Sequence, residues 1–63
     1  MRTMTVTGLA RDEGTIVVFD AFDDDRNEVQ IAVDHRPARP IVEALADGVE
    51  GVQVLVEDWQ VIG

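Results

Sequence analysis

One run of side chains in this sequence has the spacing of a calcium-binding loop. Asp23, Asp25 and Asn27 match the first, third and fifth positions of such a loop, where side-chain oxygens coordinate the ion. The pattern then fails, because Glu28 replaces the glycine of the sharp turn and Asp34 replaces the bidentate glutamate of the last position. We interpret the run as a solvated turn, in which Asp23, Asp25 and Asn27 are weak candidates for binding a cation.

The second candidate site is basic. His35, Arg36 and Arg39 are grouped at the start of a predicted helix, where the helix dipole disfavours cations. An anion such as phosphate, or a carboxylate of a partner, would offset this cost by binding the N–H groups of the first turn. The three residues are therefore a candidate anion-binding site. The alternative is a solvated patch whose arginines pair with nearby carboxylates and add little stability.

No pattern in the sequence indicates catalysis. The chain contains no cysteine, serine or tyrosine, and His35 is its only histidine, without a second ligand at a spacing usual for zinc. Carboxylates are so frequent, at 13 of 63 residues, that a pair of them says nothing about acid–base catalysis. We expect a protein that is not an enzyme and that binds no cofactor.

The charge composition predicts a salt-adapted protein. The formal net charge is −8, and all five basic residues are arginines. Self-repulsion at this charge density opposes the compact state in dilute buffer, whereas 1 M salt shortens the Debye length to about 3 Å. A GC-rich genome, in which arginine also replaces lysine, is the alternative explanation. We expect a cytoplasmic location, because no apolar stretch is long enough for a signal sequence or a membrane span.

The chain length of 63 residues predicts a single domain over residues 1–63 with one modest core. Burial of so small a core barely offsets the entropy of ordering the chain. Without cysteine, the additional stability must come from a bound ion, a partner or oligomerisation.

Hydrophobic periodicity predicts three strands, a helix and a further strand. Alternating apolar residues indicate strands over 3–9, 15–22 and 28–34, with polar turns between them. Proline ends the third strand, and Ile41, Val42 and Leu45 form the apolar face of a short helix that ends near Gly48. Residues 49–62 form the last strand, which is kinked or divided in two near Glu57 and Asp58, where the alternation changes phase.

This element order predicts a mainly β, α+β fold. It is similar to the order in small OB-like or SH3-like barrels, with a curved antiparallel sheet crossed by one helix as the alternative. Fold alone does not determine function.

The second predicted strand has two apolar faces. Val17, Phe19 and Ala21 point to one side, and the residues that point to the other are mostly apolar as well: Ile16, Val18 and Phe22. Because a strand of this kind is normally covered on both sides, we predict that Ile16, Val18 and Phe22 are enclosed by barrel curvature or lie at an interface between subunits. Phe19 and Trp59 are expected in the core.

Three functions are consistent with these features. We favour a protein-interaction module that forms a homo-oligomer. A barrel that binds single-stranded nucleic acid through aromatic residues and arginines is the first alternative, although a net charge of −8 opposes contact with phosphates. The second alternative is an anionic mimic of nucleic acid, built from a row of carboxylates on the second and third strands: Asp20, Asp23, Asp25, Glu28 and Asp34.

Overall fold

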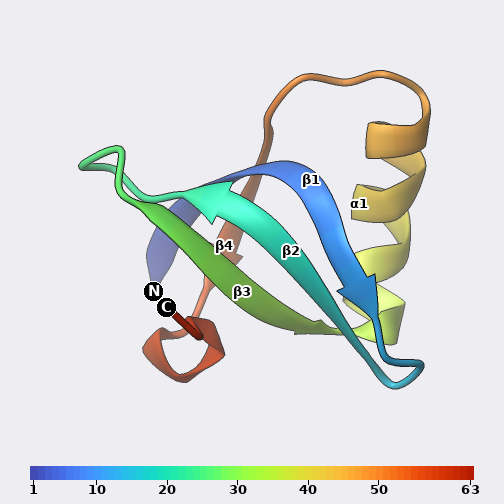
Figure 1. Ribbon diagram of the computed structural model, residues 1–63, viewed down its shortest axis with the longest axis horizontal. Coiled ribbons are helices and arrows are strands. Elements are labelled where there is room, and N and C mark those ends of the chain that lie inside the picture. The colour runs from blue at the N-terminus through green and yellow to red at the C-terminus, as the bar shows by residue number, and fades with distance from the viewer.

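The computed structural model describes all residues of the chain, 1–63, and confirms the predicted α+β class with a strongly curved sheet (Figure 1). The elements follow in the order β1, β2, β3, α1 and β4, and a short 3₁₀ helix, η1, follows β4. Their bounds are Arg2–Asp12 for β1, Ile16–Phe22 for β2, Glu28–Asp34 for β3, His35–Ala46 for α1, Val52–Val56 for β4 and Asp58–Gln60 for η1.

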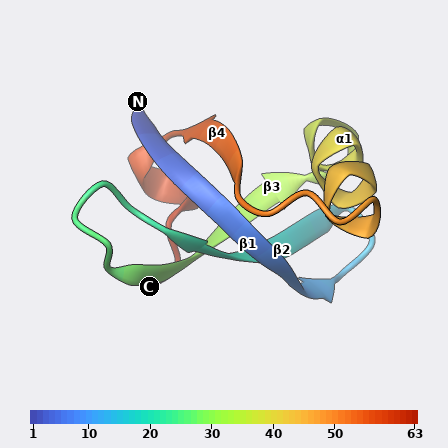
Figure 2. The same cartoon turned by 90° about the horizontal axis from the view of Figure 1, so that it is seen from above.

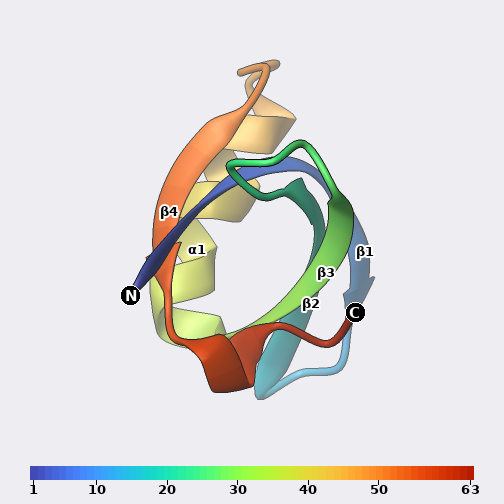
Figure 3. The same ribbon diagram turned by 90° about the vertical axis from the view of Figure 1, so that its left-hand side faces the viewer.

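The four strands form one antiparallel sheet in the order β3-β2-β1-β4. β1 is long enough to pair with β2 and, through residues Arg2 to Val6, with β4. The register between β1 and β2 shifts between Val6 and Gly8 and again between Leu9 and Arg11. Such irregularities increase the local twist and bend a strand, so the sheet curls into the half-barrel seen end-on in Figure 3.

The last residue of η1 and the segment after it cover the outer edge of β3. The backbone N–H of Ile62 donates to the carbonyl oxygen of Gln30 at 2.8 Å, and the side-chain amide of Gln60 donates to the carbonyl oxygen of Ala32 at 3.1 Å. Val61 forms an isolated antiparallel bridge with Ile31. The predicted irregularity near Glu57 and Asp58 is confirmed as η1, but the strand itself is shorter than predicted, Val52–Val56, and only the single bridge at Val61 follows it. β4 is left as the edge strand that pairs only with β1.

The helix α1 begins at His35, so that both prolines, Pro37 and Pro40, lie within it. Pro37 lies in the first turn, where its missing N–H removes no intrahelical bond. Pro40 lies inside the helix and removes one such bond, a cost that is offset by burial of Ala38 and Ile41 against the sheet. The predicted end at Gly48 is confirmed, because this residue has a φ of +86° and its N–H donates to the carbonyl oxygen of Leu45 at 3.1 Å.

The core lies between the concave face of the sheet and α1, which covers one end of the half-barrel (Figure 2). Its largest fully buried side chains include Phe19, Met4 and Ile31, so the expectation for Phe19 is confirmed. The expectation for Trp59 is wrong, because 77% of this residue is exposed. The 3₁₀ turn changes the phase of the chain, so that Val61 packs against the core while Trp59 points outward.

Candidate functional site

The predicted cation-binding run is a turn held together by Asp23. One carboxylate oxygen of Asp23 accepts the backbone N–H groups of Asp25 and Asn27, each at 2.9 Å. The other accepts the side-chain amide of Asn27 at 3.3 Å and lies 3.6 Å from the guanidinium of Arg2. Both carboxylate oxygens of Asp23 therefore already accept from donors of the chain itself, and no group of three acidic or histidine side chains is arranged to hold a metal ion.

These donors lower the pKa of the Asp23 carboxyl below its usual range. The backbone N–H of Asn27 is the largest cause, followed by the Asn27 side chain, the N–H of Asp25 and the charge of Arg2, while desolvation acts in the opposite direction. A lowered pKa in the folded state contributes stability above the ordinary pKa of aspartate, and this contribution is lost as the pH falls through the lowered value.

We expect Asp23→Asn to lower the urea midpoint modestly at neutral pH, because the variant loses the charge that Arg2 and the turn amides stabilise. The difference from the unmodified chain should shrink in acid, where Asp23 is protonated in both states. Urea titrations at several pH values measure this. Asp24→Asn, on the exposed neighbour, is the control with the same change of charge. Equal losses in both variants at every pH would contradict the role assigned to Asp23.

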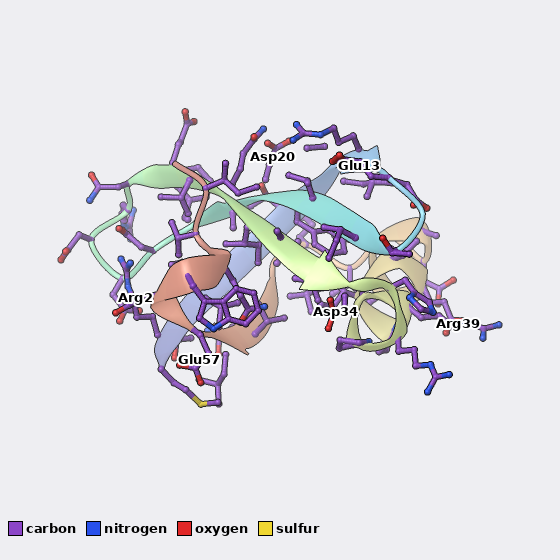
Figure 4. All side chains as sticks on the ribbon, turned by 90° about the horizontal axis from the view of Figure 1, so that it is seen from below. Arg2, Glu13, Asp20, Asp34, Arg39 and Glu57 are labelled. Carbon is purple, nitrogen blue, oxygen red and sulfur yellow. The ribbon has the colours of Figure 1, made fainter.

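The predicted anion-binding residues His35, Arg36 and Arg39 are all exposed on the first turns of α1. The N–H of His35 donates to the carbonyl oxygen of Thr15 at 3.0 Å, and Pro37 has no N–H, which leaves Arg36 as the backbone donor of this turn. Arg39 projects away from the sheet (Figure 4) and pairs with Glu43 at 3.6 Å. The structure thus groups the three residues but provides few backbone donors for an anion, and binding there stays a prediction.

The predicted interface residues lie on one face of β2 but are not equally accessible. Ile16 and Phe22 are half-buried, whereas Val18 is only 1% exposed. Val18 is the central one of the three and lies between Arg11 of β1 and Ala32 of β3. Of the two alternatives, the burial of Val18 agrees with enclosure by the folded chain itself, and an interface at the half-buried Ile16 and Phe22 stays a prediction.

A different surface has the properties expected of a contact site. A hollow of about 420 Å³, here called the seam groove, lies where β4 faces β3 and α1. Its lining residues are Val33, Pro37, Ile41, Val54, Leu55, Val56 and Gln60. None of them is charged, whereas each of the other four hollows on the chain is lined by at least two charged residues.

Large apolar side chains are exposed beside the seam groove. Leu55, which lines it, is 63% exposed, and Trp59 precedes the lining residue Gln60. β4 contains neither a charged residue nor a proline, although natural edge strands usually have such features to prevent pairing with another chain. The sequence signal for this site is the uncharged run from Gly51 to Val56 in a chain with 29% charged residues. Sequence reasoning missed it by assigning Trp59 to the core.

Comparison with known proteins gives no relative, since no protein-family model, curated protein or solved structure matches this chain. The structure contains no helix with the length and apolar character required to cross a membrane. The geometry of the β4 edge, its seam groove and the exposed tryptophan is thus the basis for a functional proposal.

Proposed function

We propose that this domain is a protein-interaction module that associates with itself through the edge formed by β4 and η1. The observation that supports this most strongly is the 77% exposure of Trp59 next to an uncharged groove. Tryptophan is enriched among the residues that contribute most to protein–protein binding. Exposed apolar side chains that lie together at the rim of a hollow are typical of an interaction site.

The free edge of β4 supports the same proposal. Its backbone groups on the side away from β1 make no hydrogen bond to another part of the chain. Val52 and Val54 pack against the core but remain partly exposed. A second chain at this edge would cover both the apolar side chains and the unpaired backbone groups, which gives a small domain the added stability that its core alone does not supply.

The distribution of charge favours a protein partner over nucleic acid. Three of the arginines form ion pairs within the chain: Arg2 with Asp23 and Asp58, Arg11 with Glu13, and Arg39 with Glu43. The two arginines without an ion pair lie on different parts of the chain, Arg26 in the turn between β2 and β3 and Arg36 on α1, which is unfavourable for contact with a phosphate backbone. The carboxylates proposed as a nucleic-acid mimic are also partly used internally, since Asp20 accepts the Gln30 amide at 3.1 Å. The proposal gives the domain no catalytic role.

We infer a salt-rich cytoplasm as the setting of this association. The support is the net charge of −8 and the absence of lysine. Two such chains repel one another in dilute solution, whereas molar salt screens the repulsion and leaves apolar contact to determine the outcome.

We expect Leu55→Glu to weaken self-association by at least about 30-fold, the effect of losing a contact of about 2 kcal/mol. The new carboxylate would lie in a contact that is otherwise uncharged. Sedimentation equilibrium in molar potassium chloride measures the association constant. Because Leu55 is 63% exposed, circular dichroism and the urea midpoint should show a folded variant.

Leu9→Glu provides the matched control, since Leu9 is 48% exposed on β1 and does not line the seam groove. This variant has the same change of residue and of charge, so it reports the general effect of one more carboxylate. Equal association of the Leu55→Glu and Leu9→Glu variants would refute the proposed surface.

A further inference from the structure

Resting on the proposed function, we propose that the domain forms a two-fold symmetric dimer in which Trp59 of each copy occupies the seam groove of the other. In this dimer the groove is occupied by the tryptophan of the second copy, and the exposed tryptophan is covered by the groove of that copy.

The projecting side chain and the hollow lie together, as a two-fold contact requires. Gln60 lines the groove, and Trp59 is its immediate neighbour in η1. In a two-fold symmetric interface each copy contributes the same surface patch. This patch must therefore contain both the group that inserts and the site that receives it. A patch with one projecting aromatic residue and one adjoining groove satisfies this condition.

The groove is large enough to hold an aromatic side chain. Its volume of about 420 Å³ lies at the lower end of the range of about 300–1,000 Å³ in which proteins hold small molecules. Its walls are aliphatic, from Val33 of β3, Ile41 of α1 and Val54 of β4. Gln60 is the only side chain of the lining with polar atoms. An indole ring matches these aliphatic walls, and its polar N–H can meet the backbone carbonyl groups that β4 leaves unpaired at this edge.

Charge identifies a second copy of this acidic chain as an acceptable occupant at this place. Two chains that each have a net charge of −8 repel one another. The repulsion is smallest where neither chain places a carboxylate in the contact. The seam groove is the one hollow without a charged lining residue. At its margin, Asp58 of η1 lies 3.8 Å from the guanidinium of Arg2, which partly neutralises it, whereas the exposed Glu57 before η1 has no ion pair.

The area needed for a stable dimer shows that more than the tryptophan takes part. A standard interface buries about 800 Å² on each partner, roughly a fifth of the 4263 Å² that this chain exposes. A buried tryptophan contributes about 150–250 Å² of this. The remainder must come from the surroundings of the groove, which is why Leu55, at 63% exposure, belongs to the same contact.

The fluorescence of Trp59 tests this arrangement directly. Trp59 is the only tryptophan and the chain has no tyrosine, so the emission reports on this one side chain. In molar potassium chloride, we expect the emission to move to shorter wavelength and to become less accessible to acrylamide as the protein concentration rises. This change should have the same midpoint as the rise in mass from one chain to two.

Trp59→Ala supplies the second measurement. Because the side chain is largely exposed in the single chain, the variant should keep its fold, and its dimer should dissociate at a concentration at least about 30-fold higher. Trp59→Phe should restore part of the association. Leu9→Ala, which removes an exposed apolar side chain elsewhere on the sheet, should leave the dissociation constant unchanged.

The outcomes separate the arrangement from the broader proposal. Association with unchanged Trp59 emission, and with equal strength in the Trp59→Ala variant, would overturn this inference but leave self-association standing. A limiting mass above two chains would overturn the two-fold arrangement. A single-chain mass at every concentration in molar salt would overturn both, and would leave the groove to a different protein.

Discussion

Replacing Val18 with aspartate should unfold the domain instead of releasing folded monomers. Val18 is 1% exposed, so the new carboxylate would be withdrawn from water. Removing an ion from water costs several kcal/mol unless a partner compensates it. Arg11 lies opposite in the register, but its side chain is 54% exposed and its guanidinium is already paired with Glu13 at 3.1 Å. It therefore provides no buried partner for the new charge.

This cost is comparable to the whole stability of a domain of this size. At about 0.05–0.15 kcal/mol per residue, a chain of 63 residues has a free energy of unfolding of roughly 3–9 kcal/mol. We therefore expect Val18→Asp to abolish the cooperative urea transition or to move its midpoint close to zero.

Far-ultraviolet circular dichroism and urea titration measure this effect, with Leu9→Asp as the control that adds the same charge at an exposed position of β1. The control should stay folded. A Val18→Asp variant that is as stable as the control and monomeric would contradict the structure and would restore the outer face of β2 as the interface.

Most of the fold was predictable because strand periodicity is a strong signal. β2 and β3 have the predicted bounds to within a residue, since alternating β-branched residues and polar turns mark them clearly. The helix begins at His35, within the group His35, Arg36 and Arg39 that the sequence places at its start, although both prolines lie inside this segment. Proline was interpreted as a break, although a helix accepts it in the first turn, and the burial of Ala38 and Ile41 offsets the lost bond at Pro40.

The site was harder to predict because it depends on tertiary contacts. Trp59 was assigned to the core on the assumption that a bulge would turn it inward. A 3₁₀ turn formed instead, in which the side chain of Gln60 accepts the N–H of Glu57 at 2.7 Å, and Val61 is the residue that reaches the core. Periodicity detects a change of phase, but the kind of irregularity determines which residue is buried.

The outer face of β2 shows another limit of periodicity. Its alternation correctly placed Ile16, Val18 and Phe22 on one side, but the pattern does not reveal how far neighbouring strands cover that side. The unpaired edge of β4 is likewise a property of the strand order, β3-β2-β1-β4, which local sequence does not specify. The uncharged run at Gly51–Val56 was visible in the sequence, yet only the strand order shows that it lies at an edge.

Salt should strengthen self-association by about 30-fold between 0.1 M and 1 M ionic strength. Two copies with a charge of −8, in contact along a molecule with extents of 26 × 23 × 17 Å, have centres about 20 Å apart. Screened Coulomb repulsion at that separation is about 2 kcal/mol at 0.1 M ionic strength and close to zero at 1 M. Apolar contact is weakened little by potassium chloride, so the dissociation constant should fall as the salt concentration rises.

The most direct test of self-association is the solution mass of the unmodified chain, measured by light scattering on a sizing column at increasing potassium chloride concentration. Self-association through the β4 edge predicts a mass that rises toward twice the 6.9 kDa of one chain and reaches it at lower protein concentration in molar salt. A mass of one chain at every salt and protein concentration would contradict it.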